Sequence, residues 1–394
     1  MISKKMENLG KNRSVIREIF EYGNKRRAEI GAENVLDFSL GNPSIPAPEK
    51  VREIMARLVT ETDPVKLHGY TSAQGDATVR KAISDSITDR FGVKASPDLI
   101  YMTCGAAASL TISLTALVND GDEVIALAPF FPEYRVFAEK AGANFRVVKC
   151  SDGDFQIDFA ALEKAINKNT KAIIVNSPNN PTGVVLSEET IVKLSDLLKK
   201  KQAEFGTSIY IICDEPYREL VYGMEVPYIP AFYDNTIVCY SFSKSLSLPG
   251  ERIGYVAVNP KCPDATLLVN MCGQISRGIG HNCPSSIIQL AVAEVLDKTS
   301  DLSVYEKNMN LLYDELTALG FTCVRPGGTF YIFPKALEDD AVAFCNKALK
   351  YDLVLVPSDS FGVPGYFRMA YCIDTEKVER SLAALRKFVE NEYR

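Results

Sequence analysis

A lysine flanked by serines stands where an apolar run of the sequence ends. The run TIVCYSFS leads into Lys244, and Ser241, Ser243 and Arg252 lie near it in the stretch SFSKSLSLPGERIGY. A lysine amine can add to a carbonyl carbon and form a Schiff base. Serine hydroxyls and the guanidinium fork of arginine are donors that bind phosphate oxygens. The stretch therefore predicts an amine nucleophile beside a phosphate site.

Polar residues also follow two other runs that we predict to be buried strands. The strand over residues 171–176 is followed by SPNNPTG with Asn180, and the strand over 209–213 by DEPY with Asp214 and Tyr217. Ligands of open α/β sheets bind beyond the carboxyl ends of the strands. Asp214 could there pair with a protonated ring nitrogen, while Asn180 and Tyr217 could hydrogen-bond a phenolic oxygen.

A further predicted strand, over residues 99–103, runs into a helix that opens with CGAAASL. Its first residues, Gly105, Ala106 and Ala107, are small enough for a phosphate to approach the free N–H groups of the helix N-terminus. Aldehyde, pyridinium, phenol and phosphate occur together on pyridoxal 5′-phosphate (PLP). These residue types therefore predict a PLP site around Lys244.

The elements that must position these residues alternate between helix and strand from about residue 75 to 258. KAIIVNSP and IYIICDEP are short continuous apolar runs, as in parallel strands covered on both faces. Between them SEETIVKLSDLLKKK (187–201) has a capping serine, an acidic start, a basic end and an apolar stripe. We predict a right-handed β–α–β unit within an α/β fold whose mostly parallel sheet is flanked by helices.

The last hundred residues change character and predict a smaller α+β domain. We expect helices near 301–319, 337–350 and 375–392, the last capped by Asp374, and strands at FTCVR, TFYIF and DLVLVP. A chain of 394 residues exceeds what one core usually holds. We predict an N-terminal arm with part of the small domain (1–48), a large PLP-binding domain (49–298) and a small C-terminal domain (299–394).

Composition excludes several other classes of protein. The net charge of −6 argues against nucleic-acid binding, and no apolar segment follows the basic N-terminus, so we expect no signal peptide. The uncharged stretch Leu99–Asn119 contains Tyr101 and several Ser and Thr residues, which favours buried core over a membrane span. Ten scattered cysteines suit reduced thiols in the cytoplasm, and with only two histidines we expect no metal site and no histidine-based triad.

SPNNPTG, DEPY and SFSKSLSLPGERIGY, in this order and spacing, resemble the motifs of fold-type I PLP-dependent aminotransferases of class I/II, the aspartate aminotransferase superfamily. The resemblance extends from GNPSIPAP near the N-terminus to FRMAYC near the C-terminus. It implies an aspartate aminotransferase-like fold and a homodimer whose active sites are shared across the interface. The implied reaction moves an amino group between an L-amino acid, with aspartate and glutamate as candidates, and a 2-oxo acid.

The resemblance also implies a role for each cofactor residue. Lys244 would hold PLP and then move a proton, and Asp214 would keep the pyridine nitrogen protonated. Asn180 and Tyr217 would bind the 3′ oxygen, and Phe131 in APFFPEY would stack on the ring. Two purely structural alternatives stay open. Asn180 also suits an ordinary turn, and Phe131 also suits packing in the core.

Four further residues are implied in substrate binding or in the dimer. Arg368 in YFRMAY would grip the α-carboxylate, and the backbone of Gly41 would close over it. Tyr70 in GYTSAQG would reach the phosphate of the partner's PLP, unless it is a simple turn residue. Arg277 would bind a side-chain carboxylate in the neighbouring active site, the alternative being a solvated loop arginine.

Two other functions fit the same motifs. A β-eliminating lyase of the cysteine-S-conjugate β-lyase type would share the fold and the cofactor, and would differ in which substrate bond breaks. A non-catalytic ligand sensor with an aminotransferase fold is the third hypothesis, although no DNA-binding extension is visible.

Overall fold

The computed structural model describes residue 7, residue 11 and residues 15–394. Seven strands form the main sheet in the order β2-β8-β7-β6-β5-β3-β4. Strand β8 runs antiparallel to both of its neighbours, β2 and β7, and all the other pairs are parallel, so the sheet is mostly parallel, as predicted. The strands are β2 (Ile100–Thr103), β3 (Glu123–Ala128), β4 (Asn144–Lys149), β5 (Thr170–Asn176), β6 (Tyr210–Asp214), β7 (Thr236–Ser241) and β8 (Gly254–Val258).

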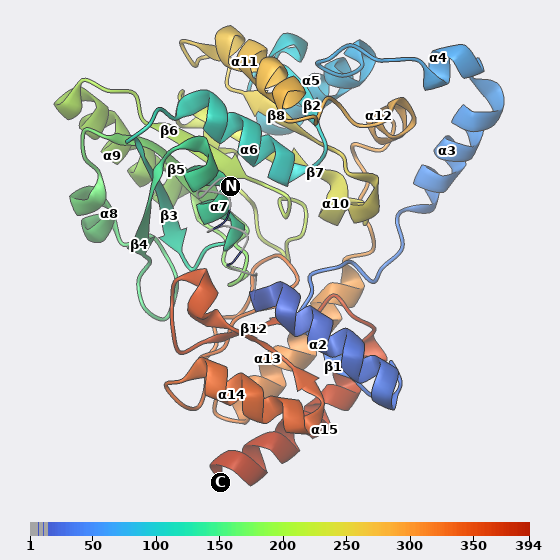
Figure 1. Cartoon of the computed structure of the whole chain (residues 1–394), viewed down its shortest axis with the longest axis vertical. Coiled ribbons are helices and arrows are strands. Elements are labelled where there is room, and N and C mark those ends of the chain that lie inside the picture. Colours follow the sequence, from blue (N-terminus) through green and yellow to red (C-terminus); the bar gives the residue numbers. More distant parts are fainter. Residues whose placement is uncertain (1–6, 8–10, 12–14) are drawn as a thin grey trace.

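Helices cover both faces of this sheet (Figure 1). Alternate strand residues point to opposite faces, so Ile211 packs in one apolar core and Ile212 in the other. Helices α6, α7 and α11 cover the Ile212 face, and α3, α5, α8, α9 and α12 cover the Ile211 face. Their bounds are α3 (Glu49–Glu61), α4 (Pro64–His68), α5 (Ala77–Phe91), α6 (Ala106–Leu117), α7 (Glu133–Ala141), α8 (Phe159–Ala165), α9 (Glu188–Phe205), α10 (Phe242–Ser245), α11 (Ala265–Gly278) and α12 (Ser286–Ala293).

The predicted β–α–β unit is formed by β5, α9 and β6. Strands β5 and β6 are parallel neighbours, and the hydroxyl of Ser187 caps α9 by accepting from the backbone N–H of Thr190. Ile191, Leu194 and Leu198 of the apolar stripe are buried against the sheet. The local sequence pattern therefore decides both where this helix begins and which face it buries.

A second unit with its own apolar core stands below the main sheet (Figure 1). It contains an antiparallel sheet in the order β11-β12-β9 and a parallel pair, β1 with β10, which brings the N-terminal segment to the C-terminal one. Helix α2 is held there by an ion pair of 2.8 Å between Arg26 and Asp352. The elements are α2 (Val15–Ile30), β1 (Leu36–Asp37), α13 (Ser303–Ala318), β9 (Tyr331–Ile332), α14 (Ala341–Ala348), β10 (Leu353–Val354), β11 (Val356–Pro357), β12 (Phe367–Ala370) and α15 (Thr375–Tyr393).

This arrangement agrees with a large α/β unit and a smaller α+β unit to which the N-terminal segment belongs. The domain limits at 48/49 and 298/299 stay a proposal. Short 3₁₀ helices complete the described elements, at Pro97–Leu99, Ile229–Ala231, Pro249–Glu251, Leu349–Tyr351 and Ser358–Phe361.

Three local predictions in the small unit were wrong. FTCVR forms no strand, because Phe321 packs into the core while the carbonyl of Thr322 accepts a single backbone bond from Lys335. DLVLVP divides into β10 and β11, which pair with different partners. Asp374 stands at the N-cap of α15, but its side chain makes no capping hydrogen bond.

No helix in residues 15–394 is long and apolar enough to cross a bilayer. The described residues hold no group of three or more His, Cys, Asp or Glu side chains suited to bind a metal ion. All ten cysteines are free thiols.

Candidate active site

A pocket of about 280 Å³ lies where β5, β6 and β7 end and α6 begins. It lies between the two units, because Arg368 and Tyr331 of the small unit form part of its wall. The pocket contains every predicted site residue except Gly105, Tyr70 and Arg277. Its lining is Leu40, Gly41, Ala106, Ala107, Leu110, Phe131, Asn180, Asp214, Pro216, Tyr217, Ser241, Ser243, Lys244, Pro249, Arg252, Tyr331 and Arg368.

Lys244 lies in the short helix α10, directly after β7. Its Nζ donates to the carbonyl of Gly41 at 2.6 Å and lies 5.3 Å from the centroid of the Phe330 ring. Burial lowers the pKa of Lys244 from 10.5 to about 8. A substantial fraction of the amine is therefore neutral, and nucleophilic, near physiological pH.

Asp214 is the last residue of β6 and is only 5% exposed. Its Oδ2 accepts a 2.5 Å hydrogen bond from the hydroxyl of Tyr134, whereas its buried Oδ1 has no hydrogen-bond partner among the described residues. Burial raises the pKa of Asp214 from 3.8 to about 7. A buried carboxylate oxygen without a partner is costly, which points to a ligand that donates to it.

The N-terminus of α6 forms one wall of the pocket through Ala106 and Ala107. Gly105 caps the helix with a φ of +92°, a backbone conformation that side chains rarely adopt. A Cβ at Gly105 would lie 3.1 Å from Nη2 of Arg252, so the guanidinium lies directly beside the start of the helix. Free N–H groups and an arginine at one point form a site for an anion such as phosphate.

Hydroxyl groups complete this anion site at the end of β7. Ser241 donates its hydroxyl to the oxygen of Ser243 at 2.8 Å, and both line the pocket. Arg252 donates to the carbonyls of Pro249 and Cys104, at 2.9 and 3.1 Å. These backbone contacts fix the guanidinium without neutralising it, so its charge remains available to a ligand.

Arg368 in β12 is 2% exposed, and no carboxylate of the described residues pairs with it. Its guanidinium donates to the carbonyl of Ser39 at 2.6 Å and to Oδ1 of Asn180 at 3.2 Å, while Nε finds no partner within the described ranges. The ring of Tyr331 lies 4.5 Å from the guanidinium carbon. A buried cation whose partners among the described residues are all neutral suits an anionic ligand.

Two tyrosines and a glycine close the pocket beside Arg368. The hydroxyls of Tyr217 and Tyr331 lie 3.1 Å apart. A Cβ at Gly41 would lie 1.9 Å from the Tyr331 hydroxyl, so only glycine lets the backbone approach here. Phe131 contributes a flat apolar wall and meets Tyr134 edge-on, with 5.7 Å between the ring centroids.

Residues 33–385 match the family model of aminotransferases of class I and II. The chain belongs to this family. It is therefore an aminotransferase, and the order and spacing of its motifs agree with that membership along nearly the whole sequence.

Several relatives of this aminotransferase are similar over their full length. An aspartate aminotransferase of Thermotoga maritima is 31% identical over 99% of this chain and 97% of that protein. A probable aspartate aminotransferase of Methanocaldococcus jannaschii is 30% identical over 99% of this chain and 100% of its own. The crystal structure of an aminotransferase from Eubacterium rectale superimposes with a TM-score of 0.97, at 50% identity and over all of both chains. The Thermotoga structure gives 0.89 at 28% identity, covering 99% of this chain and 100% of that one.

Aminotransferases of this family use PLP, and the pocket fits each part of that molecule. The unpartnered Oδ1 of Asp214 suits the ring nitrogen, and the Lys244 amine suits the aldehyde. The α6 N-terminus with Ser243 and Arg252 suits the phosphate, and Tyr217 suits the phenolic oxygen.

Besides Gly105, two predicted residues do not line the pocket of their own chain. Tyr70 is fully exposed, and Arg277 is exposed near the C-terminus of α11. Both were predicted to act in the partner's active site, so a single chain does not test either role.

Sequence reasoning missed Tyr134 and Tyr331, which contact Asp214 and Tyr217. Tyr134 stood in APFFPEY and Tyr331 in TFYIF, and both patterns were read for their apolar character. The only available signal was a hydroxyl within an apolar run, because a buried tyrosine hydroxyl needs a partner. Nothing in the sequence names that partner, since Tyr134 and Asp214 are 80 positions apart.

Proposed function

We propose that this aminotransferase binds PLP on Lys244 and transfers an amino group between an L-amino acid and a 2-oxo acid. Aspartate and glutamate are the proposed donors, in line with the relatives that carry the name aspartate aminotransferase. The observation that carries the proposal is the buried Arg368, which pairs with no carboxylate in the part of the chain that the structure describes and shares a pocket with Lys244 and Asp214. Its guanidinium can bind the α-carboxylate of an amino acid with two parallel hydrogen bonds.

When bound, PLP supplies an aldehyde and an electron-accepting ring. The residues of the chain bind and orient the substrate and the cofactor, and they transfer the proton. Arg368 and the Gly41 backbone hold the amino acid, and Nζ of Lys244 accepts the proton from its α carbon. Asp214 keeps the ring nitrogen protonated, Asn180 and Tyr217 donate to the phenolic oxygen, and Phe131 stacks on the ring.

Replacing Arg368 by leucine will weaken amino-acid binding more than cofactor binding. Loss of one partner from a buried, hydrogen-bonded charge pair costs about 2–5 kcal/mol, which corresponds to a KM raised by roughly 30- to 4,000-fold. Titration of the half-reaction with an amino-acid donor gives the affinity, and PLP titration of the apoprotein is the control. Arg368→Lys will recover only part of the loss, since it restores the charge without the fork. Unchanged donor affinity in Arg368→Leu would contradict the proposed role.

The lowered pKa of Lys244 predicts how capture of PLP depends on pH. The neutral amine is the nucleophile, so the rate of covalent PLP attachment to apoprotein will rise with pH through a midpoint of about 8. The rate is measured by absorbance, and the attachment site by borohydride reduction and peptide mass analysis. An unfolded chain, whose lysines have pKa values of about 10.4, provides the reference. A midpoint near that value in the folded protein would contradict the effect of burial.

We also propose a homodimer, located in the cytoplasm and acting in amino-acid metabolism. Tyr70 and Val65 are large side chains that are fully or mostly exposed in the single chain, as expected for a surface that a second copy covers. In this proposal Tyr70 reaches the partner's phosphate site, and Arg277 lies near the partner's substrate. Mixing a Tyr70→Phe chain with a Lys244→Ala chain tests whether the active site is shared between the two chains. Only a mixed dimer then has an intact site, in which Lys244 of the first chain is combined with Tyr70 of the second.

A panel of amino donors tests the function as a whole. Aspartate and glutamate, with aromatic, aliphatic and sulfur amino acids beside them, are compared by loss of the PLP–enzyme absorption band and by formation of 2-oxo acid. Turnover that depends on an added 2-oxo acid supports transamination. Release of ammonia and pyruvate without an acceptor would favour the β-lyase, and PLP binding without any conversion would favour the sensor.

A further inference from the structure

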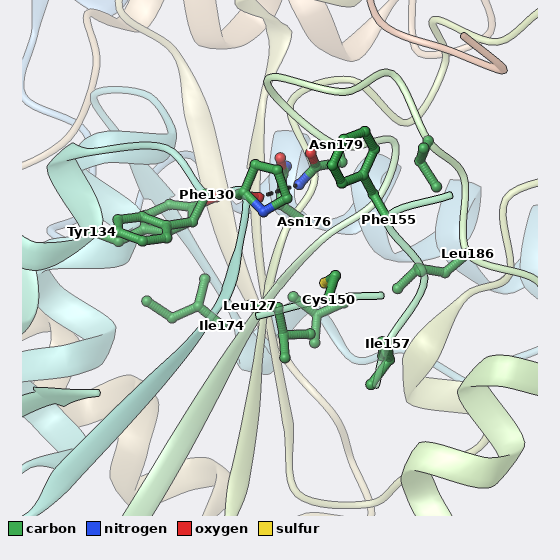
Figure 2. Close-up of a pocket in the computed structure, with 13 residues that line it drawn as sticks. Leu127, Phe130, Tyr134, Cys150, Phe155, Ile157, Ile174, Asn176, Asn179 and Leu186 are labelled. Carbon is green, nitrogen blue, oxygen red and sulfur yellow. Dashed lines mark hydrogen bonds between the residues drawn. The ribbon is translucent and has the colours of Figure 1, made fainter. Parts of the chain in front are cut away.

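Tyr134 links helix α7 to the end of strand β6. The residue is 2% exposed, and its hydroxyl donates to Oδ2 of Asp214 at 2.5 Å. Its ring borders a small, mainly apolar cavity of about 30 Å³, which Figure 2 shows between Tyr134 and Ile174 on one side and Phe155 and Leu186 on the other. The hydroxyl is thus the polar tip of a side chain that otherwise packs among apolar groups.

The carboxylate of Asp214 is held so that its two oxygens differ. Oδ2 is occupied by Tyr134, and the Asp214 carbonyl accepts from Nδ2 of Asn176 at 2.8 Å. Oδ1 has no partner among the described residues, although Asp214 lines the main pocket. The contact with Tyr134 therefore determines which oxygen remains free for a ligand.

A purely apolar role does not explain a tyrosine at this position. Phenylalanine would fill the same space, whereas a buried hydroxyl is costly unless it has a partner. Here its partner is the acid at the floor of the pocket. Burial favours the neutral form of that acid, and the hydrogen bond from Tyr134 opposes this by favouring the ionised form.

We propose that Tyr134 is a positioning residue, whose hydroxyl keeps the Asp214 carboxylate ionised and turned so that Oδ1 faces the ring nitrogen of bound PLP. The inference deepens the proposed function and depends on it. In this proposal, Tyr134 of helix α7 has two roles. Its hydroxyl positions the Asp214 carboxylate, and its ring packs edge-on against Phe131.

The test compares PLP with its carbocyclic analogue, in which a carbon replaces the ring nitrogen. The ratio of the two dissociation constants reports the contact between Asp214 and the nitrogen, independently of turnover. A hydrogen bond to a charged group is worth about 10-fold or more in affinity, so Tyr134→Phe is expected to reduce the preference for PLP by about that factor. The ¹⁵N chemical shift of labelled PLP will move toward the unprotonated value in the same variant.

Tyr233→Phe is the matched control. Tyr233 is also 2% exposed and donates its hydroxyl to a backbone carbonyl, that of Ile209, at 2.7 Å and outside the pocket. Both variants should lose comparable thermal stability, but only Tyr134→Phe should change the ratio and the ¹⁵N shift. An unchanged ratio in Tyr134→Phe would overturn the inference and leave the proposed function intact. Failure of the wild-type protein to bind PLP at all would overturn both.

Discussion

Replacement of Lys244 by alanine will reduce turnover with every amino-acid donor by about 10⁴-fold or more, since one side chain serves as both nucleophile and proton carrier. Lys244 is the only lysine among the residues that line the pocket. Its Nζ is already in contact with the Gly41 backbone that we expect to close over the substrate, and its lowered pKa favours the reactive neutral form. Steady-state rates, and borohydride reduction followed by peptide mass analysis, measure the two losses separately.

Two variants make this result specific. Lys244→Arg keeps a cation at the site but cannot form the covalent bond, so it should be as inactive as Lys244→Ala. Lys298→Ala removes an exposed lysine paired with Asp297 and should leave both activity and cofactor labelling unchanged. Small primary amines added to Lys244→Ala should restore part of the rate by replacing the missing base. Substantial turnover in Lys244→Arg would refute the role of Lys244.

The sequence was informative where chemistry and local pattern coincide. Strand ends in a parallel sheet meet at one edge, so Asn180, Asp214 and Lys244 could be assigned to one site from the ends of three apolar runs. The position of helix α9 could be predicted from its capping serine and its apolar stripe, because both are properties of residues close together in the sequence. The mostly parallel sheet followed from strands that are apolar on both faces.

The features of the fold and of the site that could not be predicted depend on contacts between segments far apart in the sequence. Strand pairing divides DLVLVP into β10 and β11, and no described strand pairs with FTCVR, although both segments have the local pattern of a strand. The hydrogen bonds of Tyr134 and Tyr331 join residues that are far apart in the chain. Periodicity shows that such side chains are buried, but it does not identify the polar group that each one meets.

Asp214→Asn is expected to lower turnover by about 10²–10³-fold while the apoprotein remains at least as stable as the wild type at pH 8. An amide has nearly the same shape but cannot balance the charge of a protonated ring. The expected stability of Asp214→Asn follows from the raised pKa of Asp214 in the wild type. The folded state binds this proton more tightly than the unfolded state, so stability falls as pH rises from about 4 to 7, and the neutral amide escapes that loss.

Glu215, the next residue along the chain, provides the opposite case and so the control. It is 2% exposed, and both its oxygens accept from the buried Arg218 at 2.6 Å. Glu215→Gln breaks a buried ion pair and should destabilise the fold by about 3–5 kcal/mol, while the folded fraction retains most of its turnover. Urea unfolding and rates per folded molecule distinguish the two variants. If Asp214→Asn instead lost stability and kept its activity, Asp214 would be a structural acid like its neighbour, and its role toward the ring nitrogen would have to be abandoned.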